Sequence, residues 1–180
     1  AIMSQQILII GLSQFSTTDF VAKMTVLLSL FSIVNIPLMP VLPSLISNAN
    51  NYLDQMMALS TGKMLKILFF VSSYGFLMSL ILKSLFPYMY GSKYAQLSES
   101  VPLVVFAAIG FSVSQLLSWI CRGMEMFIVS AFLNLTPLVI ILILFTFSSY
   151  SINSLFSFMA FMYYFVDLNV YLLMKRKVSK

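Results

Sequence analysis

Histidine is absent from the 180-residue sequence, cysteine occurs once, and charged residues are few. Without histidine, the chain lacks the side chain that most often serves as general base or zinc ligand. Because Cys121 is the only cysteine, neither an internal disulfide nor a CxxC metal or redox motif can form. Glycine-rich Rossmann and P-loop patterns are missing as well. These absences exclude the common zinc, Ser–His–Asp and nucleotide-binding enzymes, and they predict no metal and no cofactor.

The scarcity of charge indicates the class of protein. Only 8% of the residues are charged, ten basic and five acidic, whereas 61% are hydrophobic and the mean hydropathy is +1.00. A soluble domain usually has about 25% charged residues, because its surface must face water. So few charges cannot cover a soluble domain of this length. We therefore predict an all-α, polytopic transmembrane helix bundle.

The apolar segments set the number of spans. A helix needs about 20 mainly apolar residues to cross the hydrocarbon core. Five segments meet this length: Phe20–Pro43, Met64–Leu85, Val101–Trp119, Phe127–Phe147 and Ile152–Leu173. The apolar run that ends near Leu12 is shorter and indicates a partial span. Between the first two spans, apolar residues from Tyr52 to Leu59 recur at helical spacing, which predicts a short amphipathic helix at the membrane interface.

The first residues are not typical of a signal peptide. Residues Ala1–Gln6 contain no basic residue, and the apolar stretch Ile7–Leu12 is too short for the hydrophobic region of such a peptide. We expect the chain to begin inside a helix and to be a fragment of a longer protein.

The positions of the basic residues predict the orientation of the chain in the membrane rather than a nucleic-acid interface. The net charge of +5 comes from residues between the spans and from a terminal cluster, and no aromatic residues alternate with a basic strip. If the C-terminus is cytoplasmic, seven of the ten basic residues lie inside, in agreement with the positive-inside rule. These are Lys63, Lys66, Arg122, Lys175, Arg176, Lys177 and Lys180, whereas Lys23, Lys83 and Lys93 lie outside. We expect anionic lipids, and no nucleic acid, as partners of this charge.

The residues between the spans predict how the spans are connected. The segment Phe86–Tyr94 contains proline, glycine and several aromatic residues, so we expect a loop at the level of the lipid headgroups. Ser100 is expected to cap the following helix, with Pro102 in its first turn.

Polar residues inside the spans are the candidates for function, because they are costly in hydrocarbon. A stripe at helical spacing runs through Thr25, Ser29, Ser32 and Asn35, and a second runs through Ser112, Gln115 and Ser118 to Arg122. Asp167 shares a helix face with Tyr163, Tyr164 and Tyr171. Serine and threonine can instead pack between helices. Asp19 and Lys23 can form a helical salt bridge, Arg122 can be a topology signal, and Asp167 can serve ion coupling or bond a neighbouring helix.

The order of loop residues resembles a known transporter family. Four segments carry the resemblance: QILIIG at Gln6–Gly11, PLMPVLPS at Pro37–Ser44, KMLK at Lys63–Lys66, and LFPYMYGSKY at Leu85–Tyr94. They are similar to the C-terminal half of the polysaccharide-transporter (O-antigen flippase) family, within the multidrug/oligosaccharidyl-lipid/polysaccharide exporter superfamily.

The resemblance implies the second bundle of a two-bundle, MATE-like transporter in the bacterial inner membrane. Residues 1–180 would then be the C-terminal bundle, partnered by an N-terminal bundle that lies upstream. Such a protein is not an enzyme; it moves a lipid-linked oligosaccharide across the membrane by alternating access. The resemblance places the cavity on the first spans of the bundle. Its candidate cavity-lining residues are Gln5, Gln6, Lys23, Asn35, Gln115 and Arg122, with Asp167 as a candidate for ion coupling.

Three other functions were weighed, and the polar stripes in the spans argue against one of them, a purely structural or scaffold membrane protein. A drug or metabolite exporter of the same superfamily would share the fold and would have an acidic, ion-binding cavity. A membrane-embedded glycan-processing enzyme would need paired carboxylates or arginines in a large outside loop. The longest outside loop, Phe86–Glu99, has one acid and one base, so we expect a transporter.

Overall fold

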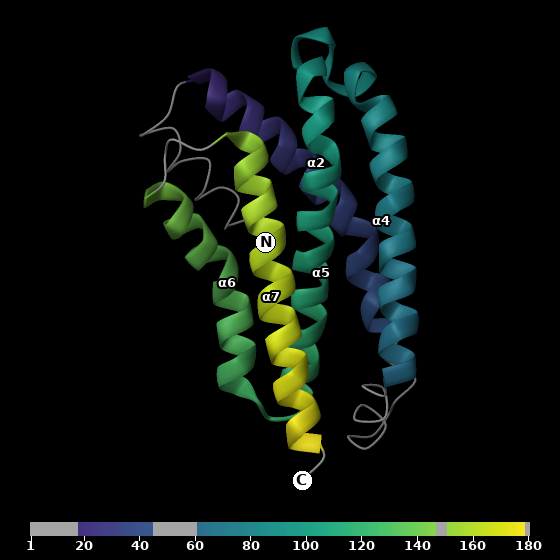
Figure 1. Ribbon diagram of the computed structural model, residues 1–180, viewed down its shortest axis with the longest axis vertical. Coiled ribbons are helices and arrows are strands. Elements are labelled where there is room, and N and C mark those ends of the chain that lie inside the picture. The colour runs from purple at the N-terminus through teal and green to yellow at the C-terminus, as the bar shows by residue number, and fades with distance from the viewer. Residues whose placement is uncertain (1–17, 45–60, 147–150, 179–180) are drawn as a thin grey trace.

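The computed structural model describes residues 18–44, 61–146 and 151–178 (Figure 1). Apart from short turns, these residues are helical, and none of them forms a strand. The helices are α2 (Thr18–Ser44), α4 (Thr61–Tyr90), the 3-10 helix η1 (Ser92–Ser100), α5 (Val101–Gly123), α6 (Phe127–Thr146) and α7 (Ile152–Val178). The predicted all-α bundle is therefore confirmed.

The long helices match the predicted spans. Four segments are long and apolar enough to cross a membrane: Thr18–Leu42, Lys66–Tyr90, Ser92–Gly123 and Ile152–Arg176. The remaining helix, α6, has 20 residues, which is about the length that a span requires. The predicted partial span before Leu12 and the predicted amphipathic helix at Tyr52–Leu59 lie outside the described residues.

Helix α5 is the central helix of the bundle, and α2, α4, α6 and α7 all pack against it (Figure 1). The span that contains α5 is mostly buried, whereas the span of α4 is mostly exposed. Small residues allow this close approach, because membrane helices associate where side chains leave room for the backbones. Those buried on α5 are Ala107, Ala108, Gly110, Ser112, Ser114 and Ser118.

The outer surface of the bundle is apolar. Phe69 and Phe76 on α4 are 76% and 62% exposed, and Ile128 on α6 is 87% exposed. Further large apolar side chains are exposed on α2 and α7. A soluble protein would not leave so large an apolar surface in water. The chain is therefore a multi-pass protein embedded in a membrane.

The helices alternate in direction, so the connections gather at two ends. The start of α4, the turn between α5 and α6, and the end of α7 lie at one end of the bundle (Figure 1). The start of α2, η1 and the start of α7 lie at the opposite end. The three segments that were expected to be on one side of the membrane are therefore at one end of the structure.

The expected loop at Phe86–Tyr94 is wrong: only Gly91 lies outside a helix, because Ser92–Tyr94 belong to the 3-10 helix η1. Helix α4 continues through Pro87 to Tyr90. A proline removes only the one helical hydrogen bond that its own N–H would donate, and the other hydrogen bonds of the helix can remain. The helix ends at Tyr90, and the next residue is Gly91, whose φ of 81° is a conformation that residues with a side chain rarely adopt. The backbone N–H of Gly91 still bonds the carbonyl of Pro87, at 2.9 Å.

Ser100 does not cap α5 with its side chain, contrary to the expectation. Its Oγ donates instead to Oδ1 of Asn153 on α7, at 2.6 Å. Pro102 lies in the first turn of α5 as expected. The hydroxyl therefore connects two helices rather than ending one.

The turn between α5 and α6 is a Schellman motif. The N–H of Met126 bonds the carbonyl of Cys121 at 2.8 Å, and the N–H of Glu125 bonds that of Arg122 at 3.1 Å. Glu125 has a φ of 58°, in the position that usually holds glycine. This tight turn makes α5 and α6 antiparallel neighbours.

Candidate functional site

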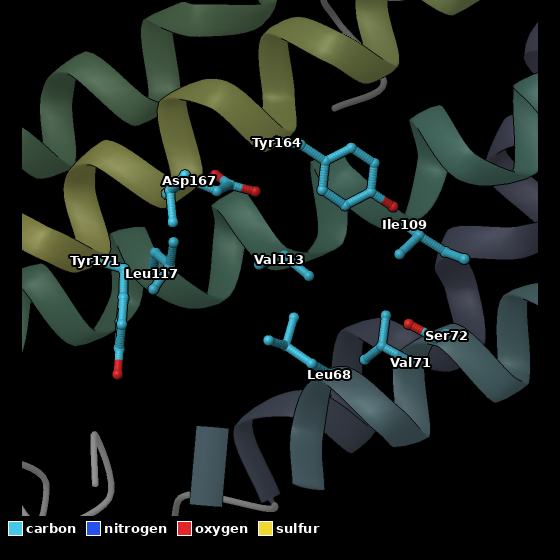
Figure 2. Close-up of a pocket in the computed structure, with 10 residues that line it drawn as sticks. Leu68, Val71, Ser72, Ile109, Val113, Leu117, Tyr164, Asp167 and Tyr171 are labelled. Atoms are coloured by element: carbon cyan, nitrogen blue, oxygen red, sulfur yellow. The ribbon is translucent and has the colours of Figure 1, made fainter. Parts of the chain in front are cut away.

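A groove of about 350 Å³ lies between α4, α5 and α7 (Figure 2). Its walls are mainly aliphatic and aromatic. They consist of Leu68, Val71 and Ser72 on α4, Ile109, Val113 and Leu117 on α5, and Tyr164, Asp167, Leu168 and Tyr171 on α7. Both α4 and α7 pack against α5, and the groove occupies the space that remains between them.

Helical spacing brings these residues together. The four residues of α7 follow the spacing i, i+3, i+4 and i+7, so they lie on one face of that helix. The three residues of α5 are four apart and form a row along the facing helix. Two rows from neighbouring helices therefore form two adjoining walls, and α4 supplies the third (Figure 2).

Asp167 is the charged residue in this wall. Its side chain is only 5% exposed, and Oδ1 accepts a hydrogen bond from Oγ of Ser114 on α5. Its Oδ2 is buried and has no hydrogen-bond partner among the described residues. A buried carboxylate oxygen without a partner is costly, because it has lost water and gained no donor. A proton or a small cation at Oδ2 would relieve that cost.

The groove has no basic residue to neutralise Asp167. Apart from this aspartate, its polar groups are the hydroxyls of Ser72, Tyr164 and Tyr171. Within the described residues, no group of three acidic, cysteine or histidine side chains could hold a metal ion. Asp167 is therefore the one charged side chain among the residues that line the groove.

Other polar side chains in the spans join neighbouring helices. On α5, Ser112 donates to Oδ1 of Asn35 on α2, and Oγ of Ser118 lies 2.9 Å from Oγ of Ser130 on α6. The amide of Asn134 donates to Ser118 at 3.0 Å. Serines 112 and 118 thus serve the packing role that was weighed for them.

The polar stripe on α2 divides in two. Thr25 and Ser32 bond carbonyls of their own helix, at Val21 and Leu28. Ser29 and Asn35 also bond carbonyls of α2, but they reach other helices as well. Oγ of Ser29 lies 2.7 Å from the hydroxyl of Tyr90, and Asn35 accepts from Ser112.

The described cavity candidates do not come together. Lys23 forms a salt bridge of 2.5 Å with Asp19 at the start of α2, as was weighed for it, and Asn35 is buried against Ser112. Gln115 is partly buried, and Arg122 is exposed near the other end of α5. None of these four lines the groove. Gln5 and Gln6 lie outside the described residues.

Asp167 is the candidate that the structure places in a wall of the groove, and its hydrogen-bond partner Ser114 was not expected. Ser114 was absent from the polar stripe, because it lies two residues from Ser112 and so points to another side of α5. Tyr164, which was expected on the face of Asp167, donates to the carbonyl of Phe106 at 3.3 Å and so joins α7 to α5. The sequence predicted the position of Asp167 beside Tyr164 and Tyr171, because the three residues share one face of a helix.

Comparison with known proteins gives no match, whether with family models, with curated proteins or with solved structures. The function must therefore be argued from the site and from the spans themselves.

Proposed function

We propose that this chain is one bundle of a membrane transporter, and that Asp167 couples transport to a proton or a monovalent cation. The observation that carries the proposal is the buried Oδ2 of Asp167, which has no partner among the described residues. An acidic residue within a span is rare, and it usually belongs to an ion or proton pathway. A purely structural aspartate would be expected to use both oxygens.

The cargo that we propose is a lipid-linked oligosaccharide, as the resemblance of the loop segments implies. The mainly apolar groove supports this choice, since it lies between α4 and α7, two helices with apolar surfaces that face lipid. Such a groove suits a long hydrocarbon tail. The lipid-linked oligosaccharides that this family moves contain an anionic pyrophosphate. The cationic residues that we propose for it are Lys23 near the start of α2 and Arg122 near the end of α5, so they would act at different stages of its passage.

A second candidate is an exporter of cationic drugs or metabolites. The specific observation in its favour is that the groove contains an acid and no base. Such a cargo would compete with the coupling ion for Asp167, whereas an anionic lipid-linked glycan would not.

We propose that the protein lies in the bacterial inner membrane with the C-terminus in the cytoplasm. The start of α4, the α5–α6 turn and the end of α7 contain most of the basic residues and share one end of the bundle. A fluorescent reporter that matures only in the cytoplasm, fused after Lys180, should fluoresce in intact cells. A second reporter, which is active only outside the cytoplasm, should be active when it is placed after Lys93. The reverse pattern would contradict this orientation.

The decisive functional test is deletion of the complete gene. We expect lipid-linked glycan to accumulate on the cytoplasmic leaflet and surface glycan to disappear, because the tail partitions into lipid while the glycan cannot cross unaided. The leaflet is identified by treating intact cells and lysed cells with a glycan-cleaving enzyme. Normal surface glycan in a strain without a redundant flippase would exclude the flippase function. Increased sensitivity to cationic compounds would then support the second candidate.

A further inference from the structure

The carboxyl group of Asp167 has no opposite charge beside it among the described residues. On α7 the nearest bases are Lys175 and Arg176, more than two turns further along the helix. The stretches of α4 and α5 that line the groove, residues 68–72 and 109–117, contain no titratable residue, and α6, which also packs against α7, contains none. The titratable neighbours of Asp167 on its own helix are the phenols of Tyr163, Tyr164 and Tyr171.

The two oxygens of this carboxyl group have different surroundings. Oδ1 accepts a hydrogen bond from Oγ of Ser114, whereas Oδ2 is buried without a hydrogen-bond partner in the described part of the chain. Because Oδ1 is engaged as an acceptor, a proton on the acid belongs on Oδ2. Protonation there removes the charge, which is the main cost of burying an acid in a low-dielectric interior.

A sodium or potassium ion is the alternative way to neutralise Asp167, and it needs a shell of oxygen atoms in place of its water. Transporters supply such oxygens from the backbone carbonyls of unwound helices. Helices α5 and α7 are instead continuous on both sides of Ser114 and Asp167, so the carbonyls around the acid are engaged within their helices. The backbone therefore offers this site no ring of carbonyls.

The side chains of the groove do not replace the missing carbonyls. Its other polar groups are three hydroxyls. Those of Tyr164 and Tyr171 point away from the carboxyl group, and Ser72 lies on the opposite wall, on α4 (Figure 2). The hydroxyl of Tyr164 is also engaged with the carbonyl of Phe106. The groove thus suits a neutral acid and lacks the ligands of an alkali cation.

We propose that Asp167 is protonated at Oδ2 in this conformation, and that the proton is the ion to which transport is coupled. The phenols beside it are themselves protonated at neutral pH, so they cannot accept this proton. The proton is therefore released to water, which reaches Oδ2 when the helices around the groove separate, and the carboxylate is protonated again from water on the other side. The neutral state of the acid stands on the geometry of the groove, whereas its coupling to export rests on the proposed function.

Labelling with dicyclohexylcarbodiimide, a lipid-soluble reagent that adds to protonated carboxyl groups, tests the state of the acid. The full-length protein is treated in membrane vesicles, and the modified residue is identified by mass spectrometry. We expect modification of Asp167 that slows as the pH rises, because the reagent requires the protonated form. Replacing choline by sodium or potassium should change the rate less than about twofold, whereas a cation bound at Oδ2 would slow it at least about tenfold when its concentration well exceeds its Kd.

Three variants sharpen this result. Asp167→Asn should lose the label, and Glu99→Gln should keep it, because Glu99 is an exposed acid outside the groove. Ser114→Ala should also be labelled, since the proposed proton is on Oδ2 and the serine bonds Oδ1. Protection of Asp167 by sodium or potassium would overturn the proton as the coupling ion while leaving the proposed transporter intact.

Infrared spectroscopy reads the same proton without a reagent that must reach it. In lipid at neutral pH, the full-length wild type should show a carbonyl stretching band of a protonated carboxyl group that is missing from Asp167→Asn. Identical spectra in this region would overturn the neutral acid. Neither measurement requires transport, so normal surface glycan in the deletion strain would remove the flippase function and leave the protonated Asp167 standing.

Discussion

Asp167→Asn is expected to abolish coupled export while leaving the bundle folded. An amide has the shape of a carboxylate and can still accept the hydrogen bond from Ser114 at Oδ1. It cannot take up and release a positive charge, so the coupling step is lost. We expect a loss of export on the order of 100-fold, which corresponds to about 2.7 kcal/mol. The folded protein should be as stable as the wild type or more so, because a neutral amide is cheaper to bury than a carboxylate.

Export is measured by restoring surface glycan in the deletion strain, and stability is measured by thermal unfolding of the purified protein in detergent. Glu99→Gln is the matched control, because Glu99 is an exposed acid outside the groove. Ser114→Ala should lower export to an intermediate level, since it removes the donor to Oδ1 but leaves the charge. Wild-type export by Asp167→Asn would remove Asp167 from the coupling mechanism. Loss of both export and folded protein would assign it a structural role instead.

The sequence was sufficient to predict the fold class. Long apolar segments and scarce charge require helices in a membrane, because a helix satisfies its own backbone in hydrocarbon. The same reasoning misjudged Phe86–Tyr90. Proline and aromatic residues suggested a loop there, but a proline near the end of a helix removes only one hydrogen bond, and α4 continues to Tyr90.

The site was predictable only in part. Asp167 stands out in the sequence, because an acid within a span requires a reason. Ser114 does not stand out, since a serine within an apolar helix is common, and its role depends on which side of α5 faces α7. The groove depends on how α4, α5 and α7 are placed relative to one another. Helical spacing defines the faces of one helix and says nothing of the distance to the next.

The second large effect is expected where α5 meets α7. At Gly110 an added Cβ would lie 2.8 Å from Cβ of Tyr163, a residue that is 1% exposed. Both atoms are attached directly to the backbone, so no side-chain rotation can separate them, and the two helices would have to move apart. Overpacking of this kind costs about 1–3 kcal/mol. Gly110→Ala should therefore lower the thermal midpoint by several degrees, and Gly110→Leu should prevent the protein from folding.

Gly75 on α4 provides the matched control. A Cβ there would also meet α5, but the atom that it meets is Cδ1 of Ile109, the far end of a flexible side chain. Ile109 lines the groove, so its side chain has free space into which it can turn. Gly75→Ala should consequently change the thermal midpoint little, and the smaller volume of the groove should be its main effect. If Gly75→Ala were as destabilising as Gly110→Ala, rotation of Ile109 would not relieve the contact, and α4 would pack against α5 as rigidly as α7 does.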